Sequence, residues 1–289
     1  MSRIGVILKS VKGNGRCWET TNPGMQTMPA KTDDLSAFAY LGDIAGKLQW
    51  LASLAAPENW EYRHSPAVLG RPYPVLLNYL RYTFKRLSEE NKISEGAKVA
   101  CFNTGLVTAL QEEIFAYLEP NEHKDQQPWF LAAFCPESDR HLLAFSKLPQ
   151  RAQYFDDPSE LLYDSRKSFR KDLTHIIDEN RNRFPEPFRP HTETHRLRIA
   201  LEGAIDHALK RVRQNYKTAV PQFYWPRGAG KGQLQLLLPL CMTSPSQVDL
   251  ALTVSREGEV YLASTVLTLD MAYNNARLVA RPDSDWLTP

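Results

Sequence analysis

The stretch "VDLALTVSREGEVYLASTVLTL", residues 248–269, does most to define the fold. It holds two apolar runs rich in β-branched residues, and the residues "REGE" (256–259) between them include a glycine. This pattern predicts two antiparallel strands joined by a short turn, a β-hairpin.

Further short apolar runs are bounded by turn-forming residues, as expected of strands. Together with the hairpin they predict one mostly antiparallel sheet with strands near Val99, Ile114, Phe130, Leu236, Leu252 and Val266.

Before and between these strands, apolar residues recur at steps of three and four, which predicts amphipathic helices. One begins after Asp33 or Asp34 as N-cap, one has Pro74 in its first turn, one includes Phe169 and Ile177, and one starts near Arg198. Because helices and strands come in blocks without a repeating βαβ order, we expect an α+β fold in which a mainly antiparallel sheet packs with several amphipathic helices. Residues 1–33 are expected to form a strand and an arm, and residues 34–289 a single domain.

The composition is that of an ordinary globular chain. In 289 residues, 35 Lys and Arg meet 33 Asp and Glu, a formal charge of +2, so attraction for an anion must come from local arrangement. The apolar runs are all far shorter than the ~20 residues that span a bilayer, so we expect a cytoplasmic protein without membrane contact.

Basic and aromatic residues gather in "LEGAIDHALKRVRQNYKTAVPQFYWPR", residues 201–227. On a helix, an apolar stripe made of Leu201, Ile205, Leu209, Val212 and Tyr216 would face the core. A charged stripe made of Asp206, Lys210, Arg213 and Lys217 would run beside it. Either this stripe is an ordinary solvated face, or it binds phosphate while Tyr216 and Tyr224 stack on bases and Asn215 and Gln222 add hydrogen bonds.

A second polar cluster follows the last predicted strand, in "LTLDMAYNNARLVARPDSDW". Asp270, Asn274, Asn275 and Arg277 are either cap and turn residues or the lining of a cleft. Asp249 opens the neighbouring strand, so Asp249 and Asp270 would either hold a divalent cation such as magnesium or manganese, or act separately as caps. We expect Arg277 to share one pocket with Asp206, Lys210, Arg213 and Lys217.

Longer motifs, among them "FNTGLVT", "HIIDENRNRFP", "GAIDHALKRVRQNYKTAVPQFY" and "LTLDMAYNNARLVARPDSDWL", resemble the family called domain of unknown function 3825. The resemblance runs from about Leu41 to Leu287. It implies no established activity, but members of that family also occur beside RNA-associated modules such as cold-shock or LOTUS-type domains, which favours RNA or nucleotides as partners.

Three functions are compatible with these residues. The first is a protein that binds single-stranded RNA, an RNA end or a nucleotide through a basic and aromatic cleft. The second is a metal-dependent enzyme acting on a phosphate-containing substrate, with Asp206, Asp270 and Lys210 as catalytic candidates. The third is a structural or interaction protein whose polar motifs tie helices to the sheet.

Overall fold

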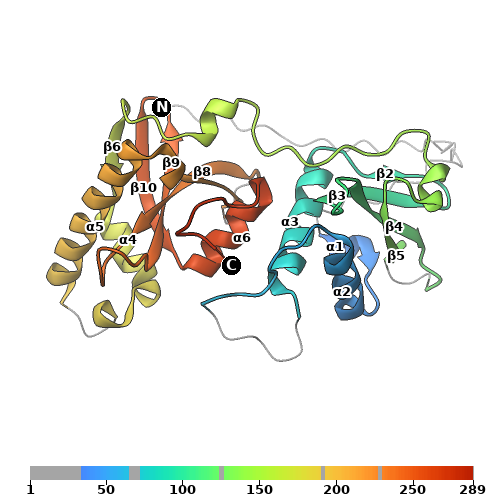
Figure 1. Ribbon diagram of the computed structural model, residues 1–289, viewed down its shortest axis with the longest axis horizontal. Coiled ribbons are helices and arrows are strands. Elements are labelled where there is room, and N and C mark those ends of the chain that lie inside the picture. The colour runs from blue at the N-terminus through green and yellow to red at the C-terminus, as the bar shows by residue number, and fades with distance from the viewer. Residues whose placement is uncertain (1–33, 65–71, 124–126, 190–192, 227–229, 289) are drawn as a thin grey trace, which may run out of the picture. The chain divides into compact units, whose positions relative to one another are not determined.

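The computed structural model describes residues 34–64, 72–123, 127–189, 193–226 and 230–288. Within these ranges the chain forms six α-helices, short 3₁₀ turns and two five-stranded sheets, which confirms the α+β class (Figure 1). The predicted strand and arm, residues 1–33, lie outside the described residues, so the domain boundary stays a prediction.

The first sheet has the strand order β1-β5-β4-β3-β2, antiparallel except for the parallel pair β1 and β5. Helix α3 packs on one face, where its Leu80 and Phe84 share a core with Phe102 and Leu118 of the sheet. The strands are β1 (Ala39–Tyr40), β2 (Ser94–Glu95), β3 (Ala100–Val107), β4 (Glu113–Pro120) and β5 (Trp129–Pro136), and the helices are α1 (Leu35–Phe38), α2 (Ile44–Leu54) and α3 (Pro74–Glu89).

The second sheet has the order β6-β10-β9-β8-β7, with β6 parallel to β10 and the other pairs antiparallel. Its centre is the predicted hairpin, whose turn needs Gly258 at a φ of +60°. The strands are β6 (Ser168–Lys171), β7 (Val220–Tyr224), β8 (Gln233–Leu240), β9 (Leu250–Glu257) and β10 (Val260–Leu267), and the helices are α4 (Leu173–Asn180), α5 (Thr194–Gln214) and α6 (Leu269–Val279).

The two faces of the second sheet carry different helices. Leu236, Leu238 and Leu240 of β8 share a core with α4 and α5, whereas Leu237 of β8 shares a core with α6. Successive residues of a strand point to opposite faces, so α5 and α6 lie on opposite sides of this sheet. The core on the α6 side also includes α3 and the first sheet.

Four expectations need correction. The six strands predicted between Val99 and Val266 all form, but they belong to two sheets. Phe169 was expected in one helix with Ile177, but it lies in β6, and α4 begins at Leu173. The helix expected after Asp34 is two helices, because Gly42 takes a φ of +59° and Asp43 caps a new helix at the Gly46 amide. The polar stretch after residue 268 is a helix, α6, whose N-cap is Thr268, so Asp270 lies in its first turn.

Candidate functional site

Helix α5 turns its charged stripe to solvent. Lys210 and Arg213 are exposed, and Asp206 forms an ion pair with Lys171 of β6 at 3.6 Å. The helix ends at Gln214, and a 3₁₀ turn of residues Tyr216–Thr218 follows. Tyr216 is therefore 60% exposed and not part of the apolar stripe, and Lys217 does not continue the row of Lys210 and Arg213.

Helix α6 uses its polar side chains to hold the segment Glu58–His64. Asp270, Asn274 and Arg277 follow one another at steps of four and three, so they lie on one helix face. The Asp270 carboxylate accepts from the His64 amide at 3.2 Å, and the Asn274 amide donates to the Tyr62 hydroxyl at 2.7 Å. These residues tie one part of the fold to another and are mostly buried.

Arg277 forms the firmest of these contacts. Its guanidinium binds both oxygens of Glu58 at 2.6 and 2.9 Å, and the side chains are 11% and 6% exposed. The guanidinium lies 4.6 Å from the centre of the Tyr79 ring and 5.2 Å from that of Trp60. Burial alone would lower the pKa of Arg277, but the hydrogen bonds and charge of Glu58 outweigh it and raise the pKa above its usual value.

The expectation that Arg277 shares one pocket with Asp206, Lys210, Arg213 and Lys217 is wrong. Arg277 lies on α6, and Lys210 and Arg213 lie on α5, on the opposite face of the second sheet. Helical spacing correctly predicted that residues of α5 share one side of that helix. It carried no information about the face of the second sheet on which α6 packs.

Asn275 and Gln222 belong to a row of hydrogen bonds inside the fold. Asn275 donates to Gln222 at 3.1 Å, Gln222 donates to Gln235 at 2.8 Å, and Gln235 donates to Ser255 at 2.8 Å. Gln222 is buried, and its side chain contacts Asn275 and Gln235. Tyr224, at the end of β7, is exposed.

Asp249 closes the turn before β9. Its carboxylate accepts from the amides of Met242 and Thr243 at 2.7 and 2.9 Å and from the Thr243 hydroxyl at 2.6 Å. Asp249 therefore has the cap role that was one of its two expected roles. Asp270 is buried and positions the backbone of His64, and metal binding by either residue stays a prediction.

A different set of residues could ligate a metal ion. Among the described residues, Cys135, Asp139 and His141 are the one group of three ligand-type side chains whose atoms lie within 4.8 Å of one another. His141 Nδ1 already binds Asp139 at 2.7 Å, and burial raises the pKa of Cys135 to about 11, so its thiol is protonated at neutral pH.

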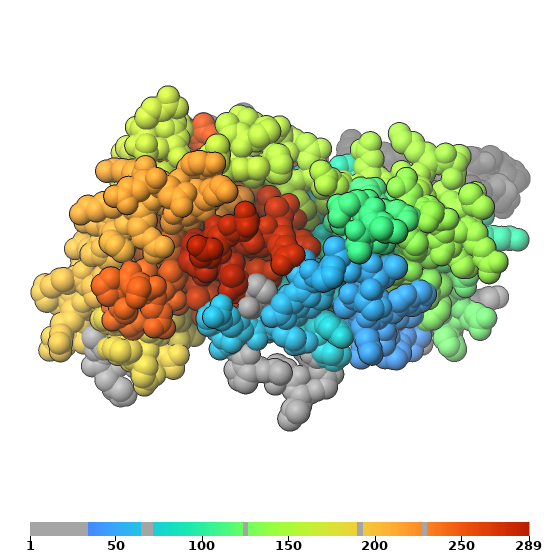
Figure 2. All heavy atoms as spheres, viewed as in Figure 1, coloured from blue at the N-terminus to red at the C-terminus, as the bar shows by residue number. Residues whose placement is uncertain are grey.

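Two predicted residues, Asn215 and Lys217, do meet in a pocket of about 700 Å³. The basic residues beside them come from two other segments: Arg211 from the last turn of α5, and Arg63 and His64 from the segment held by α6. Most of the remaining wall comes from the C-terminal segment, between Asp283 and Thr288, and from the loop residues Ser246–Val248. Figure 2 shows this segment (red) at the surface between residues of the α5 region (orange) and residues before α3 (blue).

Hydrogen bonds fix the walls of this pocket. Trp286 donates its indole N–H to the Thr218 carbonyl at 2.9 Å, and Ser284 donates to the Lys217 carbonyl at 2.7 Å. Arg63 donates to the Thr288 hydroxyl at 2.7 Å. The 3₁₀ turn after α5, the C-terminal segment and the segment before residue 65 are thus joined around one hollow.

The pocket carries more positive than negative groups. Arg63, Arg211 and Lys217 line it, against Asp283 and Asp285. Within the described part of the chain, no carboxylate lies within 4.0 Å of the three cations, whereas Arg198 of α5 does have such a partner, Glu202. Their charges are therefore available to an anion that enters the pocket.

Sequence reasoning missed Arg63, His64 and Trp286 because they lie far along the chain from the basic stretch. Arg211 was in that stretch but fell outside the aligned stripe. Arg211 could have been found from its position in the last turn of the helix, close in sequence to Asn215 and Lys217.

Comparisons with known proteins place the chain in a family without assigning it an activity. Within the described residues, each helix is too short or too polar to cross a membrane. Neither a curated protein nor a solved structure matches the chain. The family model described as domain of unknown function (DUF3825) matches residues 51–286, which include Arg63, His64, Arg211, Lys217 and Trp286, and the chain therefore belongs to this family.

Proposed function

We propose that the protein binds the phosphate group of a nucleotide or of a single-stranded RNA in the pocket lined by Arg63, Arg211 and Lys217. The observation that carries the proposal is the convergence of these three cations, Arg63 from one part of the chain and Arg211 and Lys217 from another, on one hollow with no carboxylate in ion-pair contact among the described residues. Guanidinium and ammonium groups are the groups that proteins use most to hold phosphate oxygens.

The size and the neutral groups of the pocket fit such a ligand. A volume of about 700 Å³ is within the range of small-molecule sites. Asn215 supplies an amide, although its Oδ1 already caps the Lys217 amide at 3.1 Å, so its Nδ2 is the group left to donate. Trp286 adds an aromatic wall.

The charge of the whole chain supports a short or single-stranded ligand. With a formal charge of +2, the protein as a whole attracts a polyanion only weakly, so binding depends on the local cluster. A terminal phosphate carries more charge than one inside a chain, which favours a nucleotide or an RNA end.

A metal-dependent enzyme acting on the same ligand is the second candidate. Asp283 and Asp285 line the same pocket, and carboxylates are the usual ligands of magnesium or manganese beside a bound phosphate. This candidate predicts turnover of the bound nucleotide or RNA only when the metal is added.

The test compares two double variants of equal charge. Arg211→Ala with Lys217→Ala removes two cations of the pocket, whereas Lys210→Ala with Arg213→Ala removes two solvent-facing cations of the same helix. Binding of AMP and of a labelled 5′-phosphorylated RNA of about ten nucleotides is measured by calorimetry and anisotropy between about 50 and 200 mM salt.

We expect the pocket variant to weaken binding about tenfold or more and to reduce the salt slope, since each lost phosphate contact in a single strand lowers it by about 0.7. The control variant should bind much as the wild type does. Equal losses in both variants would show that only net charge matters, and a wild type that binds neither probe at low salt would refute the proposal. Parallel assays with magnesium or manganese, read out as product formation, separate the binding protein from the enzyme.

A further inference from the structure

A stacked aromatic pair lies outside the phosphate pocket: Tyr82, exposed on α3, and Trp225, half-buried directly after β7. Tyr82 is 43% exposed and stacks on Trp225, with ring centres 5.5 Å apart and planes 19° apart. One face of the Tyr82 ring is therefore covered by Trp225, and the side chain lines a hollow of about 440 Å³.

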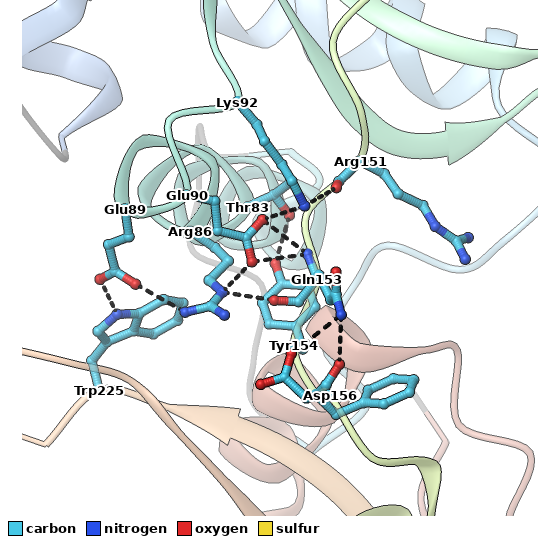
Figure 3. A network of polar contacts seen from close by, with 11 residues as sticks. Thr83, Arg86, Glu89, Glu90, Lys92, Arg151, Gln153, Tyr154, Asp156 and Trp225 are labelled. Carbon is cyan, nitrogen blue, oxygen red and sulfur yellow. Dashed lines mark hydrogen bonds and ion pairs between the residues drawn. The ribbon is translucent and has the colours of Figure 1, made fainter.

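Trp225, which directly follows β7, is held in place by α3 and by Phe223 of β7. Its indole N–H donates to Glu89 at 2.6 Å, and Arg86 contacts the same Glu89 side chain at 3.4 Å, as Figure 3 shows. The ring of Phe223 meets Trp225 edge-on at 4.9 Å. Because Trp225 is already fixed, the Tyr82 ring above it is ordered before any ligand arrives.

The hollow beside Tyr82 is polar and mostly basic. Arg81 and Lys85 line it together with Asn78, and Asp34 is its acidic member. The Lys85 ammonium also lies 5.7 Å from the centre of the Trp225 ring. An aromatic face beside cations is the combination that single-stranded nucleic acids need, because the bases stack and the phosphates carry charge.

Tyr62 connects this hollow with the phosphate pocket. Its hydroxyl accepts from Asn78, which lines the hollow, at 2.8 Å. The next two residues of the chain, Arg63 and His64, line the phosphate pocket. The two hollows are therefore linked through one residue, because Tyr62 contacts the lining of the first and directly precedes two residues that line the second.

We propose that Tyr82, supported by Trp225, is a base-stacking platform that extends the phosphate pocket and makes single-stranded RNA the ligand. This inference rests on the proposed function, since the pocket holds the phosphate while the platform holds a base of the same strand. Duplex RNA does not bind in this way, because its bases are already stacked on one another.

The test uses Tyr82→Ala and Tyr82→Phe, with Tyr40→Ala as a matched control. Tyr40 is 44% exposed and contacts another ring, Phe130, at 6.0 Å, but it lies on β1 and lines neither hollow. The probes are AMP, a 5′-phosphorylated single-stranded RNA of about ten nucleotides, the same RNA as a duplex, and polyglutamate as an acidic polypeptide. Thermal unfolding checks that each variant is folded.

We expect Tyr82→Ala to weaken single-stranded RNA binding between about 5-fold and 150-fold, the range found when one stacking residue is removed. Tyr82→Phe should stay near the wild type because it keeps the ring, and AMP binding should be unchanged in both variants. Tyr40→Ala should have no effect on either probe.

The outcomes separate the two proposals. If folded Tyr82→Ala binds the single strand within twofold of the wild type while the variant lacking Arg211 and Lys217 loses binding, the platform is refuted and the pocket stands. If duplex RNA or polyglutamate depends on Tyr82 as strongly as the single strand does, base stacking is refuted. If the wild type binds neither AMP nor RNA, both proposals fail.

Discussion

Replacing Arg277 by methionine should destabilise the protein strongly, because the change leaves Glu58 buried without its partner. The two side chains are joined by two hydrogen bonds and are 11% and 6% exposed. Tyr273 donates its hydroxyl to the same Glu58 carboxylate at 3.1 Å, but a single neutral donor does not replace a guanidinium.

The size of the effect follows from burial. Removing one partner of a buried, hydrogen-bonded ion pair costs about 3–5 kcal/mol, so Arg277→Met and Glu58→Met should each lower the free energy of unfolding by that amount. The double variant leaves no buried charge, so its loss should be well below the sum of about 6–10 kcal/mol.

The assay is urea unfolding followed by tryptophan fluorescence and circular dichroism. Trp60, one of six tryptophans, lies over Arg277, so the fluorescence signal includes this site together with the rest of the chain. The matched control is the surface pair Lys171 and Asp206, whose side chains are 31% and 65% exposed; Lys171→Met should cost less than about 1 kcal/mol.

A loss below about 1 kcal/mol for Arg277→Met would refute the view that this ion pair holds the segment Glu58–His64 in place. So would a double variant whose loss equals the sum of the single losses, because the two residues would then act independently.

Other features of the fold give three further predictions. Asp249→Ala should lower the free energy of unfolding by about 1 kcal/mol in urea titrations, because two backbone amides lose their acceptor, and magnesium should not change the wild-type value. Gly105→Ala should cost at least about 1–2 kcal/mol, since Gly105 has a φ of +73° and an added Cβ would lie 2.6 Å from the Tyr79 hydroxyl; a thermal melt like that of the wild type would contradict this. Burial raises the pKa of Cys101 to about 12 and that of Cys135 to about 11, so alkylation at pH 8, followed by mass spectrometry, should be much slower at both thiols in the folded than in the unfolded protein. Because the unfolded chain would release these protons at lower pH, stability should also fall as the pH rises from about 9 to 11.

Local patterns were enough to predict much of the secondary structure. The hairpin of β9 and β10 follows from two apolar runs around a glycine, and α3 follows from Pro74 and the stripe that includes Leu80 and Phe84. These signals depend on periods of about two and 3.6 residues, which are properties of neighbouring residues in the chain.

The sequence also marked several residues whose chemistry is unusual without showing their contacts. Asn274 and Arg277 lie in a short stretch with several polar residues, which indicated a special role for them. The structure shows that both bind the segment Glu58–His64. Lys217 and Asn215 belong to the basic stretch, and they do line the pocket that is proposed to bind phosphate, although Lys210 and Arg213 do not.

Only the tertiary structure decided which of these residues meet. The predicted strands divide into two sheets, α5 and α6 pack on opposite faces of the second, and Arg63 reaches the same pocket as Arg211 and Lys217. A hydrophobic stripe predicts that a helix has a buried face, but it does not predict the surface on which that face packs. Any apolar surface of matching shape would remove the same apolar area from water. The amino-acid sequence alone therefore determined those elements that a local period marks, such as the hairpin and α3, while long-range packing determined the pocket.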